Sequence, residues 1–235
     1  MESVTIIIPS RIGSTRLPRK PLLDFNGKPM VYRIYEKCLN WGRANDVFVA
    51  TDSEEIKEAV ESRGGKVIMT SPDHENGTSR CIEAFEKIGS PEGILINIQG
   101  DEPFVSEVHL NGLVETLVLK EKSDVSTILY WLTEESEVES ESVVKAKIGE
   151  DGIVEDFFRK GLSPFGHIGI YGFRTNIIHH IKNLPSTERE RNERLEQLKW
   201  MEGGIKIGVE IVEDKTIAID VLEDYQRALE IIKSE

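Results

Sequence analysis

Four cationic side chains fall within ten residues near the N-terminus, although the 235-residue chain has a formal net charge of −13. They are Arg11, Arg16, Arg19 and Lys20, and they follow the apolar run VTIIIP. Gly13 lies among them and lets the backbone approach a ligand closely. Arginine offers a planar fork to phosphate oxygens, and lysine offers a compact charge. The segment therefore predicts a polyphosphate site, with a basic surface loop as the alternative.

Carboxylates follow another apolar run, in the sequence NIQGDEP. Mg²⁺ binds one or two carboxylates together with phosphates of a ligand. Asp101, next to Glu102, is therefore a candidate metal ligand, although an ordinary turn would explain the same residues. Asp220 ends the apolar stretch TIAID, which we expect to be a strand. It is expected to cap the last helix or to bind metal, and these two roles do not exclude each other.

The sequence HENGTSR, from His74 to Arg80, has two interpretations. Thr78 or Ser79 could cap the helix that follows, because hydroxyl side chains accept hydrogen bonds from free backbone N–H groups. Alternatively, the backbone of this segment and Arg80 bind a base or a phosphate. His167 stands alone before an apolar run, and a structural histidine is the favoured interpretation there.

In the first half of the chain, segments with the hydrophobic pattern of a strand alternate with segments that have the pattern of a helix, and these elements must position the residues above. Apolar runs typical of buried strands are each followed by apolar residues at helical spacing, and the joints are short. Such alternation predicts βαβ units and a Rossmann-like, mostly parallel sheet with helices on both faces. Ligands bind beyond the carboxyl ends of such strands, so the polar segments above should share one crevice. The expected strands are 4–9, 46–52, 66–71 and 93–101, and the expected helices are 30–42, 53–65 (capped by Ser53), 78–89 and 106–122.

The second half predicts a smaller mixed β region. Two short strands flank Asp151-Gly152, which is a hairpin signal. The acidic segment 133–142 is expected to be an exposed loop. We expect one domain over 1–235, with a nucleotide-binding half (1–123) and a second half (124–235). The remaining expected strands are 124–132, 167–174 and 205–213, and the remaining helices are 175–184, 190–204 and 222–233.

Composition narrows the class of protein. Hydrophobic residues make up 39% and charged residues 30% of the chain, as in soluble globular proteins. An acidic chain is unsuited to nucleic acid or anionic membranes, and no run is long enough to span a bilayer. The N-terminal residues do not resemble a signal peptide, and Cys38 and Cys81 are expected to be buried and unpaired, so the expected location is cytoplasmic. Neither G-x-x-x-x-G-K-[ST] nor G-x-G-x-x-G is present, which disfavours P-loop and dinucleotide-binding enzymes.

The motifs together resemble those of the CMP-KDO synthetases, the 3-deoxy-manno-octulosonate cytidylyltransferases of the sugar nucleotidyltransferase group. The resemblance is dense from Val4 to Pro103 and returns from His167 to Trp200. It implies Mg²⁺-dependent transfer of CMP from CTP to the acidic sugar KDO, release of pyrophosphate, use in lipopolysaccharide synthesis, and a homodimer. The motifs are IIIPSRIGSTRLPRKPL, NGKPMV, VATD, NGTSR, NIQGDEP, HIGIYGFR and LEQLKW.

The resemblance also implies roles for individual residues. Those expected to act in catalysis are Arg11, Arg16, Lys20 and Asp101. Those expected to bind CTP are Pro9, Ser10, Arg11, Ser14, Arg16, Lys20, Asp73, Gly77, Thr78 and Arg80. Those expected at the sugar are Gln99, His167, Tyr171, Glu196 and Gln197, and the metal ligands are Asp101 and Asp220. The carboxylate of the sugar needs a cation, for which Arg159 is a candidate, with an exposed hairpin arginine as the alternative.

The chain departs from the family pattern at three places. The stretch from Asp156 to Gly166 is shorter than usual, Arg19 replaces a common glycine, and the sequence around Asp220 lacks the usual threonine and proline. A related acceptor, such as an amino-substituted octulosonate or a nonulosonic acid, therefore stays open. A non-catalytic nucleotide-binding module is the alternative from another class, and retention of Asp101 and Asp220 disfavours it.

Overall fold

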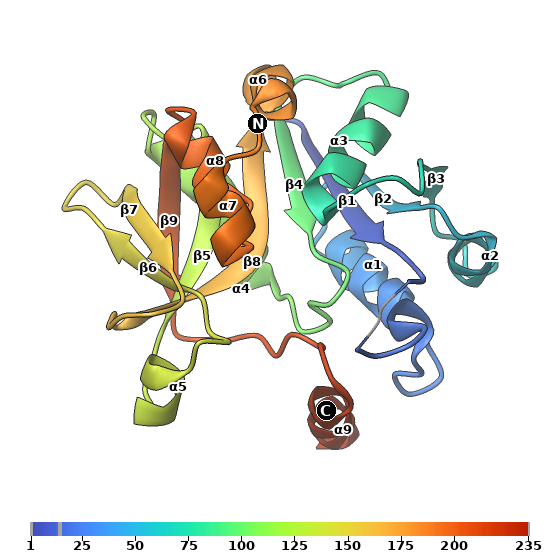
Figure 1. Cartoon of the computed structure of the whole chain (residues 1–235). Helices are drawn as coiled ribbons and strands as arrows, with labels where there is room; N and C mark the ends of the chain where they lie inside the picture. Colours follow the sequence, from blue (N-terminus) through green and yellow to red (C-terminus); the bar gives the residue numbers. More distant parts are fainter. Residues whose placement is uncertain (1, 14–15, 235) are drawn as a thin grey trace. The chain divides into compact units, whose positions relative to one another are not determined.

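The computed structural model describes residues 2–13 and 16–234, which form two compact units (Figure 1). Unit 1 comprises Met1–Glu107 and Thr216–Glu235, and unit 2 comprises Val108–Lys215. The chain thus leaves unit 1 after its first βαβ elements and returns to it with its last helix.

These units do not coincide with the halves 1–123 and 124–235 that the sequence predicts. The shift in strand pattern near residue 124 does not reveal that the last helix belongs with the first strands, because that association depends on contacts between residues far apart in the chain. The assignment to a single domain stays a prediction.

Unit 1 contains a parallel sheet with the strand order β3-β2-β1-β4. The apolar runs form its strands because β-branched residues pack well on a pleated surface that is covered on both sides. Every residue of β1 and β4 is buried. The strands are β1 (Val4–Ser10), β2 (Asp46–Thr51), β3 (Val67–Met69) and β4 (Ile94–Ile98).

Helices cover both faces of this sheet. Right-handed crossovers place α1 and α2 on one face, and the return from β3 to β4 places α3 on the other. This confirms the predicted α/β fold. The helices of unit 1 are η1 (Lys20–Leu22), α1 (Met30–Asn40), α2 (Glu54–Glu61), α3 (Gly77–Lys87) and α9 (Leu222–Ser234).

Of the caps predicted for α2 and α3, the first is confirmed and the second was wrong. Ser53 caps α2 as expected, accepting a hydrogen bond from the Ile56 N–H. The cap of α3 is Asn76, whose Oδ1 accepts from the Ser79 N–H at 2.8 Å, rather than Thr78 or Ser79. Asparagine at this position leaves the Ser79 hydroxyl available for another partner.

The apolar stretch 216–220 is not a strand, contrary to the prediction. Its alternating pattern reflects the burial of Ile219, whose N–H donates to the Asp101 carbonyl at 2.9 Å. The Asp220 side chain does not form the expected cap, because its carboxylate pairs with cations of the first loop. Asp224 instead accepts from the N–H groups of Asp220 and Val221 at the start of α9.

Unit 2 has a mixed sheet, as predicted. β5 pairs antiparallel with β8 and parallel with β9, and β6 pairs with β7 in the expected hairpin. The hairpin loop is longer than two residues, and Gly152 takes a φ of 72° within it. The strands are β5 (Val125–Trp131), β6 (Lys145–Ile148), β7 (Val154–Phe158), β8 (Phe165–Arg174) and β9 (Ile207–Val212).

The helices of unit 2 correct two expectations. The stretch 190–204 forms two helices rather than one, because Arg194 adopts a left-handed conformation (φ 55°) that ends α7. Part of the acidic segment 133–142 is the short helix α5 instead of a loop, although none of its residues is buried. The helices are α4 (Glu107–Leu119), α5 (Glu135–Glu139), η2 (Thr175–Ile177), α6 (Ile178–Asn183), α7 (Glu188–Glu193) and α8 (Gln197–Glu202).

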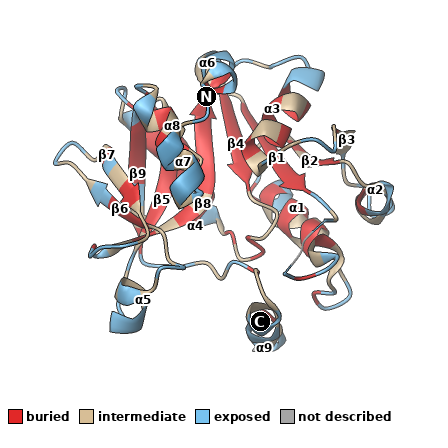
Figure 2. Cartoon of the chain, in the orientation of Figure 1, coloured by how far each residue is buried: buried red, intermediate tan, exposed pale blue. Residues whose placement is uncertain are grey.

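Burial follows the strands in each unit except β3, whose residues are half-buried, and α7 has no buried residue (Figure 2). Cys38 and Cys81 are buried and not in a disulfide, as predicted. Among the described residues, no helix combines the length and apolarity needed to cross a membrane.

Candidate functional site

A cavity of about 270 Å³ opens in unit 1 at the carboxyl ends of β1 and β4. The chain runs from β1 to β2 on one side and reaches β4 on the other, so this is the point where the strand order reverses. Open α/β sheets bind ligands at such a point. The cavity is lined by Pro9, Ser10, Arg11, Gly13, Arg16, Lys20, Pro21, His74, Asn76, Gly77, Arg80, Gln99, Gly100, Asp101 and Asp220.

Two glycines keep the cavity walls close together. A Cβ added at Gly100 would lie 2.7 Å from the Pro9 carbonyl oxygen, and one at Gly77 would lie 2.4 Å from Gln99 Oε1. Both distances are shorter than real side chains adopt. Glycine is therefore required where β4 ends beside β1, because the backbone of Pro9 cannot give way, whereas at Gly77 the flexible Gln99 side chain would have to move to admit a Cβ.

Lys20 joins the two predicted metal-binding aspartates. Its ammonium donates to Asp101 Oδ2 at 3.1 Å, to Asp220 Oδ1 at 3.4 Å and to the Ile219 carbonyl at 2.8 Å. The lysine side chain is only 14% exposed, whereas those of Asp101 and Asp220 are 34% and 41% exposed. The structure therefore brings three of the predicted site residues together, and the two carboxylates remain open to a ligand.

Arg16 and Arg19 differ although they belong to one loop. Arg16 Nη2 donates to Asp220 Oδ1 at 2.9 Å and lines the cavity. Arg19 adopts a left-handed conformation (φ 57°) and pairs with Glu55 on α2. Arg19 is not among the cavity-lining residues, so its side chain does not add charge to the cavity wall.

Glu102 is buried beside the carboxylates. Burial, and then the neighbouring charge of Asp101, raise the pKa of the Glu102 carboxyl to about 8, and a hydrogen bond with Thr216 opposes this shift. Its Oε2 has no hydrogen-bond partner among the described residues. The carboxyl is therefore mostly protonated at neutral pH, so it adds little negative charge to the site.

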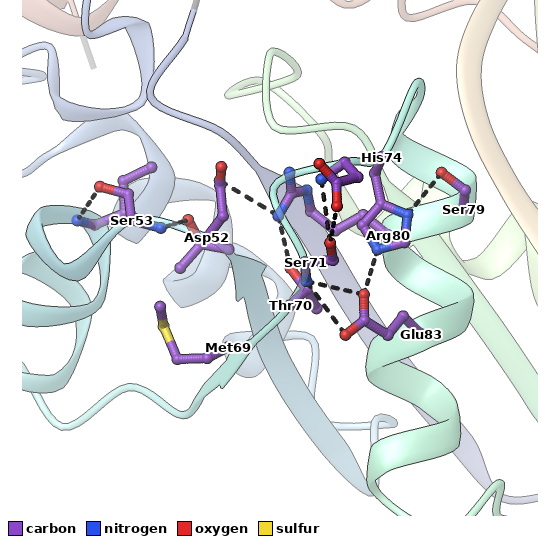
Figure 3. Close-up of polar contacts among 12 residues, drawn as sticks. Asp52, Ser53, Met69, Thr70, Ser71, His74, Ser79, Arg80 and Glu83 are labelled. Carbon is purple, nitrogen blue, oxygen red and sulfur yellow. Dashed lines mark hydrogen bonds and ion pairs between the residues drawn. The ribbon is translucent and has the colours of Figure 1, made fainter.

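Arg80 reaches the cavity from α3 and is held from two sides (Figure 3). Its Nη1 donates to Thr70 Oγ1 at 2.6 Å and lies 3.3 Å from Asp52 Oδ1. Burial lowers the pKa of the guanidinium, Asp52 opposes this shift, and Arg11 adds to it. Since arginine stays protonated in proteins, Arg80 supplies a fixed positive charge.

His74 lines the cavity from the loop before α3 (Figure 3). Its Nδ1 lies 3.0 Å from Ser79 Oγ, and its Nε2 is in short contact with Glu83 Oε2. Burial alone would raise the pKa of Glu83, but hydrogen bonds from Lys87, Ser71 and His74 lower it to about 2. Glu83 is therefore a carboxylate that orients the imidazole.

The residues predicted for the sugar, except Gln99, lie in unit 2. Tyr171 donates to Gln197 Oε1 at 3.2 Å, and burial together with the charge of Glu196 raises the pKa of the tyrosine. The His167 ring packs between Phe157 and Tyr171 at centroid distances of 4.8 and 5.6 Å, and its Nε2 lies 2.8 Å from Thr127 Oγ1. Burial lowers the pKa of His167 to about 3, so it is neutral.

Arg159 is engaged with main-chain oxygens. Its Nε donates to the Glu193 carbonyl at 3.2 Å, and its Nη1 donates to the carbonyls of Glu141 and Ser142. It therefore stabilises neighbouring segments of unit 2. A role at the sugar carboxylate stays a prediction.

Most of the residues predicted for CTP line the cavity, but two do not. The Thr78 hydroxyl accepts from Asn97 Nδ2 at 3.0 Å inside the protein, and the Asp73 carboxylate accepts from Ser71 Oγ at 3.1 Å. Ser14 lies outside the described residues. The prediction did not include His74, Asn76 or Gly100, although all three stand in motifs that the sequence singles out.

Comparisons with known proteins cover almost the whole chain. A sequence profile described as Cytidylyltransferase matches residues 5–207. A protein of Porphyromonas gingivalis named 3-deoxy-manno-octulosonate cytidylyltransferase is 37% identical over an alignment 250 positions long, which covers 99% of this chain and 97% of that protein. A protein of the same name from Bacteroides thetaiotaomicron is 39% identical over an alignment 247 positions long, which covers 97% of each chain.

Solved structures agree with the sequence comparisons. The structure of CMP:2-keto-3-deoxy-manno-octonic acid synthetase complexed with CTP superposes with a TM-score of 0.91 at 33% identity and covers 99% of each chain. HddC from Yersinia pseudotuberculosis, at 20% identity and a TM-score of 0.69, shares the fold. The profile match over most of the chain and the near-full-length relatives show that this chain belongs to the cytidylyltransferase family, a class of nucleotidyltransferases.

Proposed function

We propose that this protein transfers CMP from CTP to 3-deoxy-manno-octulosonate and releases pyrophosphate. The observation that carries the proposal is the convergence of Lys20, Asp101 and Asp220 in a cavity that also contains Arg11, Arg16 and Arg80. Such a combination of cations and carboxylates suits a metal-bound triphosphate. The relatives that bear this enzyme's name match nearly the full chain.

The donor set at Asp101 and Asp220 fits Mg²⁺. A positively charged group, the Lys20 ammonium, already lies within 3.1 and 3.4 Å of the two carboxylates, so the position favours a cation. Within residues 2–13 and 16–234, no cluster of three or more His, Cys, Asp or Glu side chains could hold a metal alone. Two carboxylates with phosphate oxygens and water are the ligands that Mg²⁺ accepts, and the bound ion would neutralise phosphate charge.

The protein's own groups would position the reactants. Arg11 and Arg16 would hold phosphate oxygens, and Lys20 would keep the two aspartates aligned. In the reaction, the anomeric oxygen of the sugar forms a bond to the α-phosphorus while the bond to the departing pyrophosphate breaks, and the hydroxyl proton is lost. Positioning and charge neutralisation supply most of the rate enhancement in such transfers.

The acceptor is proposed to bind through His167, Tyr171, Glu196 and Gln197, as the family resemblance implies. Tyr171 and Gln197 are already hydrogen-bonded to each other, and the neutral His167 can exchange hydrogen bonds with sugar hydroxyls. Because the segment from Asp156 to Gly166 departs from the family pattern, an amino-substituted octulosonate or a nonulosonic acid is the second candidate acceptor. The CMP-sugar product would be used in lipopolysaccharide synthesis, as the family resemblance implies. The enzyme itself would be a cytoplasmic homodimer.

Release of pyrophosphate from CTP tests the proposal. The assay is run with KDO, with its 8-amino analogue and with a nonulosonic acid, each with Mg²⁺ and with EDTA. We expect the highest kcat/KM with KDO, no turnover in EDTA, and weak activity when UTP or ATP replaces CTP. Higher kcat/KM with another acidic sugar would overturn the assignment of KDO but preserve the transfer chemistry. No release with any acceptor would overturn the enzymatic assignment.

A further inference from the structure

Glu83 lies outside the cavity but contacts the loop that forms one of its walls. Its two oxygens accept from the Ser71 N–H at 3.2 and 3.0 Å, and Oε2 is in short contact with His74 Nε2 (Figure 3). Lys87 pairs with the same carboxylate at 2.7 Å. Glu83 thus connects α3 to both ends of the segment Ser71–His74, and His74 lines the cavity.

All the hydrogen bonds around His74 form together when both of its ring nitrogens carry protons. Ser79 Oγ donates to the Asn76 carbonyl at 3.0 Å, and this uses the single hydroxyl proton. The same oxygen lies 3.0 Å from His74 Nδ1, so Nδ1 donates wherever that bond is kept. Nε2 faces a carboxylate that only accepts, so Nε2 donates as well. A neutral ring would give up either the bond from Ser79 to Asn76 or one of the bonds of the ring nitrogens.

We propose that Glu83 is a positioning residue for nucleotide binding, which fixes the Ser71–His74 segment and holds His74 as an imidazolium in the cavity wall. The positive charge favours an anionic nucleotide, and the fixed loop shapes the cavity. The inference rests on the proposed function, because it takes CTP as the ligand of the cavity.

Other charged groups around His74 set its electrostatic environment. Glu83 stabilises the imidazolium, whereas the cations Arg80, Lys87 and Arg11 oppose it. Two of these cations have carboxylate partners of their own, since Arg80 pairs with Asp52 and Lys87 pairs with Glu83. Asp73, in the same loop, adds a negative charge near the histidine. Direct contact with Glu83 is therefore the interaction that distinguishes His74 from the rest of the cavity wall.

Nitrogen NMR tests the proton count without any ligand. In the ¹⁵N-labelled full chain at neutral pH, we expect both His74 ring nitrogens at the shift of protonated nitrogen, assigned by loss of the signals in His74→Gln. In Glu83→Gln, one nitrogen should move to the shift of an unprotonated ring nitrogen. A neutral His74 in the wild-type protein would overturn the proposal, even if the variants fail to fold.

Calorimetric titration with CTP in Mg²⁺ buffer tests the consequence for binding. Loss of one charge-assisted contact should raise the Kd for CTP about tenfold in Glu83→Gln. His74→Gln should raise the Kd for CTP by a similar factor. The Kd of the double variant should be close to that of either single variant, because each change removes the same contact between Glu83 and His74. Glu86→Gln, which changes the same charge at an exposed position of α3, should bind as the wild type does.

Kinetics separate positioning from a merely structural role. Glu83→Gln should raise the KM for CTP while kcat stays within about twofold, because no reacting atom is touched. Unchanged CTP affinity in a folded Glu83→Gln protein would overturn the proposal.

The outcomes also separate this inference from the proposed function. A wild-type protein that fails to bind CTP would overturn both. A protein that binds CTP but does not transfer CMP to KDO would overturn the acceptor assignment alone, and the comparison of Glu83→Gln with the wild type would still decide the role of Glu83.

Discussion

The ammonium of Lys20 lies 3.4 Å from the carboxylate of Asp220, although 200 residues separate the two in sequence. The same ammonium lies 3.1 Å from Asp101, so one lysine holds two carboxylates that follow different elements. Both aspartates are partly exposed and face the cavity, whereas the lysine is mostly covered. The lysine therefore aligns two potential metal ligands before any metal or nucleotide binds.

Asp101→Asn should reduce kcat by about 100-fold or more, because it removes a carboxylate proposed to bind Mg²⁺ and leaves charge on the phosphates unneutralised. Pyrophosphate release measures the loss. The fold should be retained, since the side chain is partly exposed, and circular dichroism with a thermal melt checks this. Normal turnover in the folded variant would contradict the metal assignment.

Arg16→Ala should raise the KM for CTP about tenfold or more, because a charge-assisted hydrogen bond to phosphate is lost. Steady-state kinetics with varied CTP measure the change. Arg19→Ala is the matched control, since Arg19 belongs to the same loop but pairs with Glu55. It should change the KM by less than about twofold. Equal effects of the two substitutions would argue that only the net charge of the loop matters.

Asp52→Asn should lower the free energy of unfolding by about 2 kcal/mol, because the buried guanidinium of Arg80 loses the carboxylate at 3.3 Å. The KM for CTP should rise as well, since Arg80 lines the cavity. Urea unfolding and CTP kinetics measure the two effects. Asp46→Asn, at the start of the strand that Asp52 follows, breaks a largely exposed pair with Lys66 and should cost less than about 1 kcal/mol.

Glu102→Gln should remove a pH dependence of stability. The pKa of Glu102 is raised from 4.5 to about 8, so the folded protein keeps a proton that the unfolded chain loses above pH 4.5. The contribution of protonated Glu102 to the free energy of unfolding is fully present below pH 4.5. It is lost as pH rises to about 8, at a rate of up to about 1.4 kcal/mol per pH unit.

Thermal melts in EDTA at several pH values between 4.5 and 8.5 compare Glu102→Gln with the wild type. The variant should gain stability relative to the wild type as pH rises. Glu92→Gln removes an exposed carboxylate that precedes β4, at the opposite end of this strand from Glu102, and should run parallel to the wild type at every pH. If melting temperature depended on pH in the same way for the wild type and for Glu102→Gln, the pKa of Glu102 would be the same in the folded and unfolded protein, and the prediction would be wrong.

Gln197→Ala should raise the KM for the acidic sugar while leaving the KM for CTP unchanged, because Gln197 and its partner Tyr171 belong to unit 2, whereas the residues that line the nucleotide cavity belong to unit 1. Kinetics with each substrate varied in turn measure both constants. Glu202→Gln, at an exposed position of the same helix, should change neither. A selective rise in the KM for CTP would contradict the assignment of Gln197 to the acceptor.

The sequence predicted most of the sheet and the placement of the phosphate loop, because these depend on local patterns. The run from Val4 to Ser10 is buried along its whole length, and Asp101 follows a second such run, so both had to lie at one edge of a parallel sheet. Asp220 was a candidate metal ligand because it ends an apolar stretch, but its approach to this edge depends on long-range contacts with Lys20 and Arg16.

Other features depend on contacts between distant residues or on backbone conformations that the sequence does not specify. The residues 216–220 have the alternation of a strand but are fixed by the Asp101 carbonyl and by Lys20. Arg194 ends α7 in a left-handed conformation that no glycine or proline announces. Asn76, Thr78 and Ser79 all have side chains that can cap a helix, and the sequence does not specify which of them does so.

The order in which the chain is made gives the position of Asp220 a further meaning. During synthesis on a ribosome, the cationic loop and Asp101 emerge long before residues 216–220 exist. A nascent polypeptide could therefore fold its first βαβ elements and attract nucleotides, yet it would lack one of the two carboxylates that Lys20 aligns. Turnover would begin only once that late segment had docked beside the first loop, so translation itself would delay the onset of activity.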